Sequence, residues 1–263
     1  MDLSWRAEME PSQSPSPWFE AWFDNPHYHQ LYGNRSYAEA EAFVSAMHTQ
    51  WGWDNLSLLD LACGKGRHAR AAALKGHAVV GVDLSPNSIA SARLEHDDVS
   101  GLTFLEGDMR DFNLKQQFDG ILNLFTSFGY FSEPQDHLAV LANVYAHLKP
   151  GGFFVLDFLD VHFAQRHLVS SEQLERGGVN YSISRTLTPP VAGGYPTFVK
   201  HIVHEGPDGK KEHVERVAAL DNTHLTDMMT QSGFEILGRY GSYALEPWSE
   251  GESNRLILHA RKS

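Results

Sequence analysis

The chain has 263 residues, of which 42% are hydrophobic, so it can bury the core of one elaborated domain. Its formal net charge of −12 at pH 7 disfavours nucleic acid as a partner, because a phosphate backbone normally selects a basic groove. The single cysteine, Cys63, excludes an internal disulfide framework, and no apolar run approaches the roughly 20 residues that cross a bilayer. We therefore expect a cytoplasmic protein with no membrane partner.

The first fifty residues predict a helical cap. Aromatic side chains are concentrated between Trp18 and Tyr32, and the pattern over residues 37–51 brings Phe43 and Met47 to one helical face. We expect residues 1–50 to pack as helices in front of a main sheet.

From residue 57 onward, segments with strand and helix patterns alternate. The expected strands are 57–61, 78–83, 102–106, 118–123 and 153–157. The expected helices are 66–75, 86–95 and 135–148, the last of which ends at the Lys149 to Gly152 turn. Such alternation predicts βαβ units and a parallel sheet with helices on both faces, and it defines residues 51–160 as the first part of the core.

The composition changes between residues 161 and 220, where threonine, valine, tyrosine, proline and glycine dominate. Stretches of period two and a Gly-Pro-Asp-Gly turn at 206–209 predict an inserted antiparallel β-subdomain over residues 161–220, which we expect to act as a lid and substrate wall. Residues 221–263 then predict a last helix and two strands. The expected fold is an α/β sheet of seven strands with the last strand antiparallel.

A glycine turn follows the first predicted strand. Gly64 and Gly66 let a ligand approach the backbone, and the free N–H groups at the start of the next helix favour negative charge. The spacing from Gly64 to Ala69 also fits a dinucleotide fingerprint, with Asp83 about 20 residues later as the acceptor of ribose hydroxyls. An NAD-dependent oxidoreductase is therefore one interpretation of this turn.

Two acidic positions argue against NAD. Asp60, which we place inside the turn just before the glycines, would repel a pyrophosphate but suits the ammonium of an amino-acid cofactor. Asp108 and Met109 follow the third predicted strand, where the carboxylate can accept from an adenine amino group and the apolar side chain can pack on the ring. These residues predict a cofactor that joins an amino acid to adenosine.

At these motifs the chain resembles the class I S-adenosylmethionine (SAM)-dependent methyltransferases. The resemblance runs from about residue 56 to 157 and resumes at 221, and the motifs fall in family order. It implies a Rossmann-like fold, SAM as cofactor with S-adenosylhomocysteine as product, and methyl transfer to an O or N atom of a small-molecule acceptor. The same motifs would also suit an RNA or tRNA methyltransferase, or a regulator that binds SAM without catalysis. Oligomeric state is not predicted.

The resemblance assigns the methionine end of SAM to Asp60 and the glycine turn, the ribose to Asp83, and the adenine to Asp108 and Met109. Ala62 stands where many members carry glycine, and Arg67 is a candidate for the contact to the cofactor carboxylate. The complete expected set in the core is Asp60, Ala62, Gly64, Gly66, Arg67, Asp83, Leu84, Asp108, Met109, Asn123, Leu124 and Phe125.

The segment 123–131 follows the fourth predicted strand, where the family places the transferring methyl. Methyl transfer is an in-line displacement, so the enzyme mainly aligns the reactants and excludes water, and aromatic faces attract the sulfonium. The Asn-Pro-Pro-Tyr motif of enzymes that methylate exocyclic amines is absent from this loop, which disfavours bases in nucleic acid. Phe125 and Tyr130 are catalytic candidates here, although either could simply pack against the core.

In the predicted cap, Tyr28, Tyr32 and Arg35 resemble residues that close over SAM in small-molecule methyltransferases, although core or surface packing would also explain them. Tyr32 is also a catalytic candidate, as is Glu246, a candidate base between the last two strands. His201 and His204 differ by three on a predicted strand, so they should point to opposite faces, and we expect solvated histidines there. We predict no metal site and no effect of EDTA on activity.

Overall fold

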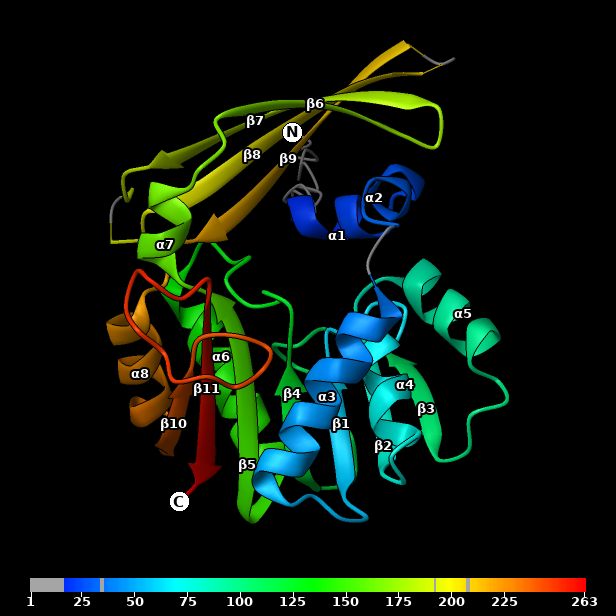
Figure 1. Cartoon of the computed structure of the whole chain (residues 1–263), viewed down its shortest axis with the longest axis vertical. Helices are drawn as coiled ribbons and strands as arrows, with labels where there is room; N and C mark the ends of the chain where they lie inside the picture. The colour runs from blue at the N-terminus through cyan, green and yellow to red at the C-terminus, as the bar shows by residue number, and fades with distance from the viewer. Residues whose placement is uncertain (1–16, 34–35, 192, 207–208) are drawn as a thin grey trace, which may run out of the picture.

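The computed structural model describes residues 17–33, 36–191, 193–206 and 209–263, which form two β-sheets with helices around them (Figure 1). The strands of the larger sheet are β1 (Ser57–Leu61), β2 (Ala78–Asp83), β3 (Leu102–Glu106), β4 (Phe118–Asn123), β5 (Leu148–Leu159), β10 (Phe234–Tyr240) and β11 (Arg255–Lys262). Their order in the sheet is β10-β11-β5-β4-β1-β2-β3.

Five strands of this sheet are parallel, and β11 runs antiparallel to both β5 and β10. This confirms the expected seven-stranded sheet with an antiparallel last strand. The strand order reverses direction between β1 and β4, and in open α/β sheets ligands bind outside the carboxyl ends of the strands at such a point.

The larger sheet is buried on both faces because alternate residues of each strand enter different hydrophobic clusters. Leu59 and Ile121 lie in the cluster that α6 (Pro134–His147) and α8 (Asn222–Gln231) cover. Their neighbours Leu58 and Leu122 lie in the cluster that α3 (Tyr37–Trp51), α4 (Arg67–Ala73) and α5 (Pro86–Glu95) cover. This explains why the parallel strands read as continuous apolar runs in the sequence.

The second sheet contains β6 (Ser171–Arg176), β7 (Val179–Thr188), β8 (Thr197–Gly206) and β9 (Gly209–Ala218), all antiparallel to their neighbours. It lies beyond the carboxyl ends of the parallel strands, and α1 (Trp18–Phe23) and α2 (Pro26–Leu31) lie on the side of it that faces the core (Figure 1). The antiparallel sheet expected in this part of the chain is therefore present. The central residues of the predicted 206–209 turn lie outside the described residues.

Two local expectations were wrong. A six-residue helix, α7 (Val161–Arg166), opens the segment that we expected to form the inserted β-subdomain, and its N-terminus is capped by the Asp160 side chain, which accepts from the N–H of Phe163. The residues Lys149 to Gly152 are part of β5 and do not form a turn, because Leu148 already pairs with Phe118 and a register shift absorbs the extra residues. None of the described helices is long and apolar enough to cross a membrane.

Candidate active site

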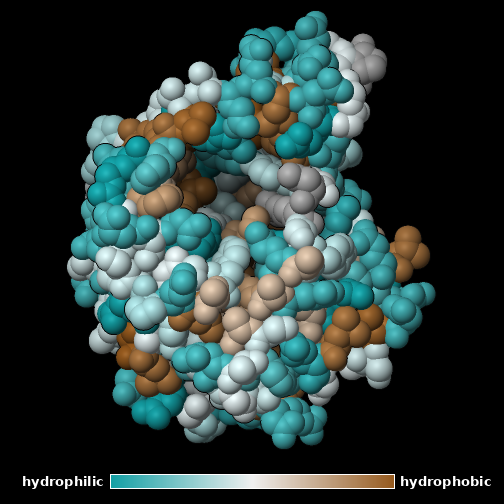
Figure 2. Space-filling view, viewed as in Figure 1, coloured by the Kyte–Doolittle hydropathy of each residue, from teal (hydrophilic) through white to brown (hydrophobic). Residues whose placement is uncertain are grey.

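A cavity of about 340 Å³ lies at the switch point of the large sheet, below the N-terminal helices. In the space-filling view the molecule is deeply hollowed between the two sheets (Figure 2). Twelve of the expected cofactor residues line the cavity, namely Tyr28, Tyr32, Asp60, Ala62, Gly64, Arg67, Asp83, Leu84, Asp108, Met109, Leu124 and Phe125. Their side chains and backbone come from elements far apart in the sequence, so the fold brings the predicted set together.

Two further expected residues that the structure describes, Gly66 and Asn123, do not line this cavity. Gly66 packs against Phe104: a Cβ atom at Gly66 would lie 2.3 Å from the ring, and the residue has a φ of 79°, so glycine is needed there for packing and for the turn. Asn123 is buried and donates through Nδ2 to the backbone oxygen of Leu61, which ties β4 to β1. Arg35 lies outside the described residues.

Asp60 lies within β1 and not in the turn that follows, which corrects its expected position. It is 1% exposed, and the backbone N–H of Ala69 donates to it. Oδ2 is buried, and no described residue forms a hydrogen bond with it. Burial, together with the nearby negative charge of Asp83, raises the pKa of Asp60 to about 7. The cavity therefore holds a carboxyl group whose charge lacks a direct partner.

Arg67 begins α4 and brings the opposite charge into the same cavity. Nη1 donates to the backbone oxygen of Ser36 and to Glu39, at 3.2 Å in both cases, and the guanidinium carbon is 4.2 Å from the centre of the Phe125 ring. Nη2 is buried without a hydrogen-bond partner among the described residues. Buried polar groups are nearly always satisfied, so Asp60 Oδ2 and Arg67 Nη2 together fit an amino-acid zwitterion.

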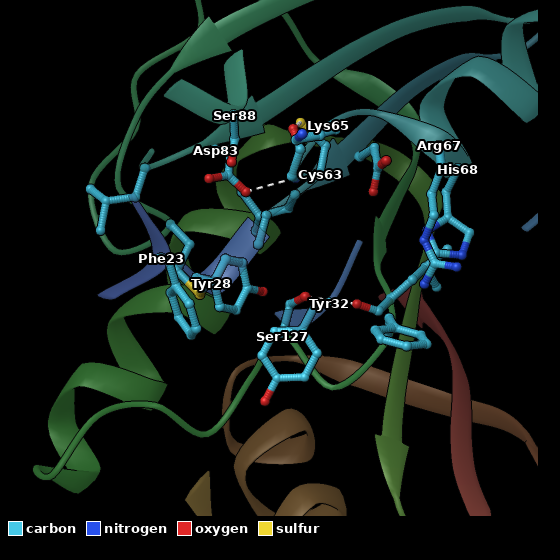
Figure 3. A pocket seen from close by; sticks show the side chains of 18 of the residues that line it. Phe23, Tyr28, Tyr32, Cys63, Lys65, Arg67, His68, Asp83, Ser88 and Ser127 are labelled. Carbon is cyan, nitrogen blue, oxygen red and sulfur yellow. Dashed lines mark hydrogen bonds between the residues drawn. The ribbon is translucent and has the colours of Figure 1, made fainter. Parts of the chain in front are cut away.

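Asp83 ends β2 and braces the glycine turn. Its Oδ2 accepts from the backbone N–H of Gly64 at 2.7 Å, and its Oδ1 accepts from the backbone N–H of Ser85 at 2.9 Å. In the close view, Asp83 lies beside Cys63 and its bond to the turn is drawn (Figure 3). The acid is thus fixed at the end of β2, where it can also accept from the hydroxyls of a ribose.

Asp108 is held by its neighbour Arg110. Nη2 of the guanidinium lies 2.6 Å from Oδ2, and the backbone N–H of Arg110 donates to Oδ1 at 2.8 Å. Burial alone would raise the pKa of Asp108, but these bonds hold this pKa below its usual value. The carboxylate is therefore charged near neutral pH and lies beside Met109 on the cavity wall.

The aromatic side of the cavity comes from the two N-terminal helices and from the loop after β4. Tyr28 and Tyr32 have ring centres 4.9 Å apart, and Phe23 packs beside Tyr28 at 5.0 Å (Figure 3). Phe125 and Tyr130 contribute from the loop, and the Tyr130 hydroxyl donates to the backbone oxygen of Thr126 at 2.7 Å. Aromatic rings thus line the cavity on two sides.

A polar network that the sequence did not reveal links α1 and α2 to the second sheet. The Glu215 carboxylate of β9 accepts from the Tyr32 hydroxyl at 2.7 Å and from Trp22 Nε1 at 2.7 Å. Lys200 of β8 donates to the Tyr32 oxygen and lies 3.6 Å from Glu215. The contacts of Trp22 and Tyr32 with the second sheet join residues more than 160 positions apart, so only the pairing of Lys200 with Glu215 across a predicted β8–β9 hairpin could have pointed to part of the network.

Two further candidates lie elsewhere. Glu246 is exposed, accepts from the Ser242 hydroxyl at 2.9 Å, and does not line this cavity. His201 and His204 do point to opposite faces of β8, but His204 is only 2% exposed. The His27 ring packs on it at a tilt, with ring centres 3.9 Å apart, and the Nε2 atoms of His204 and His213 lie 3.2 Å apart. The expectation of solvated histidines was therefore wrong for His204.

The large sheet is Rossmann-like, and the cavity lies at its switch point, where such sheets bind ligands. A family profile described as "Methyltransferase domain" matches residues 58–152. The chain is 36% identical over 201 residues to the dTDP-3-amino-3,4,6-trideoxy-alpha-D-glucopyranose N,N-dimethyltransferase of Streptomyces venezuelae, covering 76% of this chain and 80% of that protein. It is 28% identical over 229 residues to the dTDP-3-amino-3,6-dideoxy-alpha-D-glucopyranose N,N-dimethyltransferase of Streptomyces fradiae, covering 86% and 85%.

Among solved structures, the chain is similar to the CcbJ methyltransferase of Streptomyces caelestis, with a TM-score of 0.76, 17% identity, and coverage of 93% of this chain and 99% of that chain. This likeness concerns the fold. The chain belongs to the family of SAM-dependent methyltransferases, and SAM is its cofactor. The relatives give no support to an NAD-dependent oxidoreductase or to an RNA methyltransferase.

Proposed function

We propose that this enzyme transfers the methyl group of SAM to the amino nitrogen of a sugar carried by a small molecule. The relatives from S. venezuelae and S. fradiae support this acceptor class, because both are named as N,N-dimethyltransferases of amino sugars linked to dTDP. The proposal narrows the sequence-based expectation of an O or N atom to nitrogen. It also agrees with the excess of negative charge, which favours a small acceptor over a nucleic acid.

The proposed position of the cofactor rests on two buried polar atoms of the cavity residues that lack a hydrogen-bond partner among the described residues. These atoms are Asp60 Oδ2 and Arg67 Nη2. Asp60 would accept from the ammonium group of the methionine end, and Arg67 would donate to its carboxylate. Asp83 would accept from the ribose hydroxyls. Asp108 and Met109 would contact the edge and the face of the adenine.

SAM supplies an electrophilic methyl group on a sulfonium when it is bound. The work of the chain is alignment of the acceptor nitrogen and exclusion of water, which account for most of the acceleration in such a displacement. Tyr28 and Tyr32 cover the cavity from the N-terminal side, while Phe125 and Tyr130 form the wall after β4. Their ring faces would stabilise the positive charge that the methyl donor carries.

The second sheet would serve as the lid and the acceptor wall. Tyr32 connects it to the cavity, because the phenol lines the cavity and its hydroxyl is bound by Glu215 of β9. A lid attached in this way leaves space for a small molecule between the sheets (Figure 2). It would restrict access of a folded polymer to the methyl group.

The test is a comparison of matched acceptors by mass spectrometry. The enzyme is incubated with SAM and either dTDP-3-amino-3,6-dideoxyglucose, the same compound with a hydroxyl at carbon 3, or tRNA. We expect one or two methyl groups on the amino sugar only. Methylation of tRNA or of the hydroxyl compound, with none on the amino sugar, would contradict the proposal.

Two variants serve as internal controls in that assay. Asp60→Asn should abolish methylation of the amino sugar, because the ammonium of the cofactor loses its acceptor charge. Glu246→Gln should leave the rate unchanged, since Glu246 is exposed and lies outside the cavity.

A further inference from the structure

The loop after β4 adopts a backbone conformation that it would not choose by itself. Phe125 and Thr126 are consecutive residues with φ angles of 62° and 59°. This left-handed region is sparsely populated by residues other than glycine, and it is especially unfavourable for a β-branched residue such as threonine. Such a turn persists only where surrounding groups hold it.

The groups that hold this turn are Asp157 of β5 and Arg255 of β11. Oδ2 of Asp157 accepts from the backbone N–H of Phe125 at 2.7 Å, and the backbone oxygen of Asp157 accepts from the N–H of Thr126 at 3.0 Å. Arg255 donates through Nε to Oδ1 of Asp157 at 2.7 Å and through Nη2 to Oγ1 of Thr126 at 2.9 Å. Both residues of the turn are therefore tied to one ion pair.

The pair is buried and lies behind the cavity wall. The Asp157 side chain is fully buried, and Nη2 of Arg255 lies 2.6 Å from Oδ1. Neither residue lines the cavity, whereas Leu124, Phe125 and Ser127, which surround the strained position, do. The Phe125 ring also packs on the guanidinium of Arg67, the residue proposed to hold the cofactor carboxylate.

We infer that Asp157 and Arg255 are positioning residues for methyl transfer, which act by holding the Phe125–Thr126 turn in its left-handed form against the cofactor. The inference rests on the proposed placement of SAM in this cavity. If the pair is broken, the turn relaxes, Phe125 leaves the guanidinium of Arg67, and the wall next to the methyl group loses its shape.

The chain offers a matched control in a second carboxylate of the same sheet. Asp119 of β4 accepts from the backbone N–H of Ser57 at 2.9 Å and is paired with Lys149 at 2.8 Å. It thus makes the same two kinds of contact as Asp157, but it lies near the start of β4, away from the cavity. The pair of Asp119 is more exposed than that of Asp157, and Asp119→Asn reports the effect of losing a carboxylate–cation pair where no turn depends on it.

The experiment measures SAM affinity by calorimetry and the hydrogen exchange of residues 124–131 without ligand. For Asp157→Asn we expect at least tenfold weaker SAM binding and faster exchange in this segment. For Asp119→Asn we expect affinity within about twofold of the original chain and unchanged exchange. If Asp157→Asn does not fold, Arg255→Lys replaces it, because this variant keeps the charge and loses the second donor to Thr126.

A suppressor variant separates positioning from a general loss of stability. Thr126→Gly, added to Asp157→Asn, makes the left-handed conformation accessible without help, so part of the lost SAM affinity should return. Unchanged SAM affinity and unchanged exchange in Asp157→Asn would overturn the inference and leave the proposed function intact. Absence of SAM binding by the original chain would overturn both, and loss of affinity in Asp157→Asn with no rescue by Thr126→Gly would overturn the inference alone.

Discussion

At the scale of single residues, Asp60 is the most informative position in the molecule. A carboxyl group that is buried beside a second carboxylate is costly to ionise, and its raised pKa reports this cost. Perturbed groups of this kind concentrate at functional sites. The cost is offset when a positively charged group binds to Oδ2, which is the role that we propose for the ammonium of SAM.

The affinity for SAM should depend on pH through Asp60. The pKa of the carboxyl is about 7 without ligand, and an ammonium partner lowers it. The protonated acid prevails below pH 7 and has to release its proton before it can pair with the cofactor, so binding should be roughly tenfold weaker at pH 6 than at pH 8. Calorimetric titration across this range measures the effect, and a flat profile in the original chain would contradict it.

The same residue should limit the stability of the ligand-free protein. The folded form raises the pKa of Asp60 from 3.8 to about 7, so it binds more protons than the unfolded form between these values. This contribution therefore favours folding at low pH and is lost as the pH rises through 7. Asp60→Asn should raise the free energy of unfolding at pH 8 by on the order of 2 kcal/mol, measured by urea denaturation, while it weakens SAM binding. A lower free energy of unfolding for Asp60→Asn than for the original chain at pH 8 would contradict this prediction.

At the scale of elements, the N-terminal helices and the second sheet act on the cavity as one unit. Glu215 of β9 is the contact point, since it accepts from Trp22 of α1 and from Tyr32 at the end of α2. Lys200 beside it is largely buried; burial lowers its pKa and the nearby Glu215 carboxylate raises it, so the carboxylate favours the charged lysine. The covering of the cavity by the N-terminal helices is thus coupled to the lid sheet.

Glu215→Gln should loosen this coupling. We expect SAM binding to weaken by about threefold to tenfold, because the hydrogen bonds to a neutral amide are weaker and Lys200 loses its partner. Hydrogen exchange of residues 18–32 should increase as well. Glu212→Gln is the matched control on the same strand, because Glu212 is exposed and pairs with Lys210 at 2.7 Å, away from the cavity. Equal effects of the two changes would exclude the proposed coupling.

The elements that were predictable from sequence are those whose signals are local. The strands of the large sheet carry apolar runs, and the crossover from β2 to β3 begins with a helix signal, Ser85 before Pro86, where the serine caps α5. The helix α7 was missed because Val161 and Phe163 resemble strand residues and six residues are too few to show a helical period. The cap by Asp160 was the signal that could have revealed it.

The residues of the candidate site also fall into those that could be placed from the sequence and those that could not. Residues that follow strand ends, such as Asp83 and Asp108, could be placed because parallel strands end at one edge of the sheet. Glu215 and the Asp157–Arg255 pair could not be placed, because their partners lie far away in sequence and depend on strand register or on how the cap packs. Gly66 does not line the cavity, and the sequence could not show this, since a glycine needed for contact with Phe104 looks the same as one needed for a ligand.

At the scale of the whole molecule, the large sheet and the N-terminal helices enclose a cavity whose unsatisfied groups match the two charges of an amino acid. The large sheet supplies the acid and the glycine turn, α4 supplies Arg67, and the N-terminal helices and the loop after β4 supply the aromatic rings. We propose that this arrangement binds the methionine end of the cofactor through Asp60 and Arg67.

The most direct test compares two ligands that differ only at that end. S-adenosylhomocysteine carries the amino-acid group, whereas 5′-methylthioadenosine lacks it and keeps the adenosine. Calorimetry should show that the original chain binds S-adenosylhomocysteine at least 100-fold more tightly, and that Asp60→Asn and Arg67→Met reduce this ratio to within about tenfold with little change for methylthioadenosine. An undiminished ratio in both variants would contradict the account, because the amino-acid group would then be bound elsewhere.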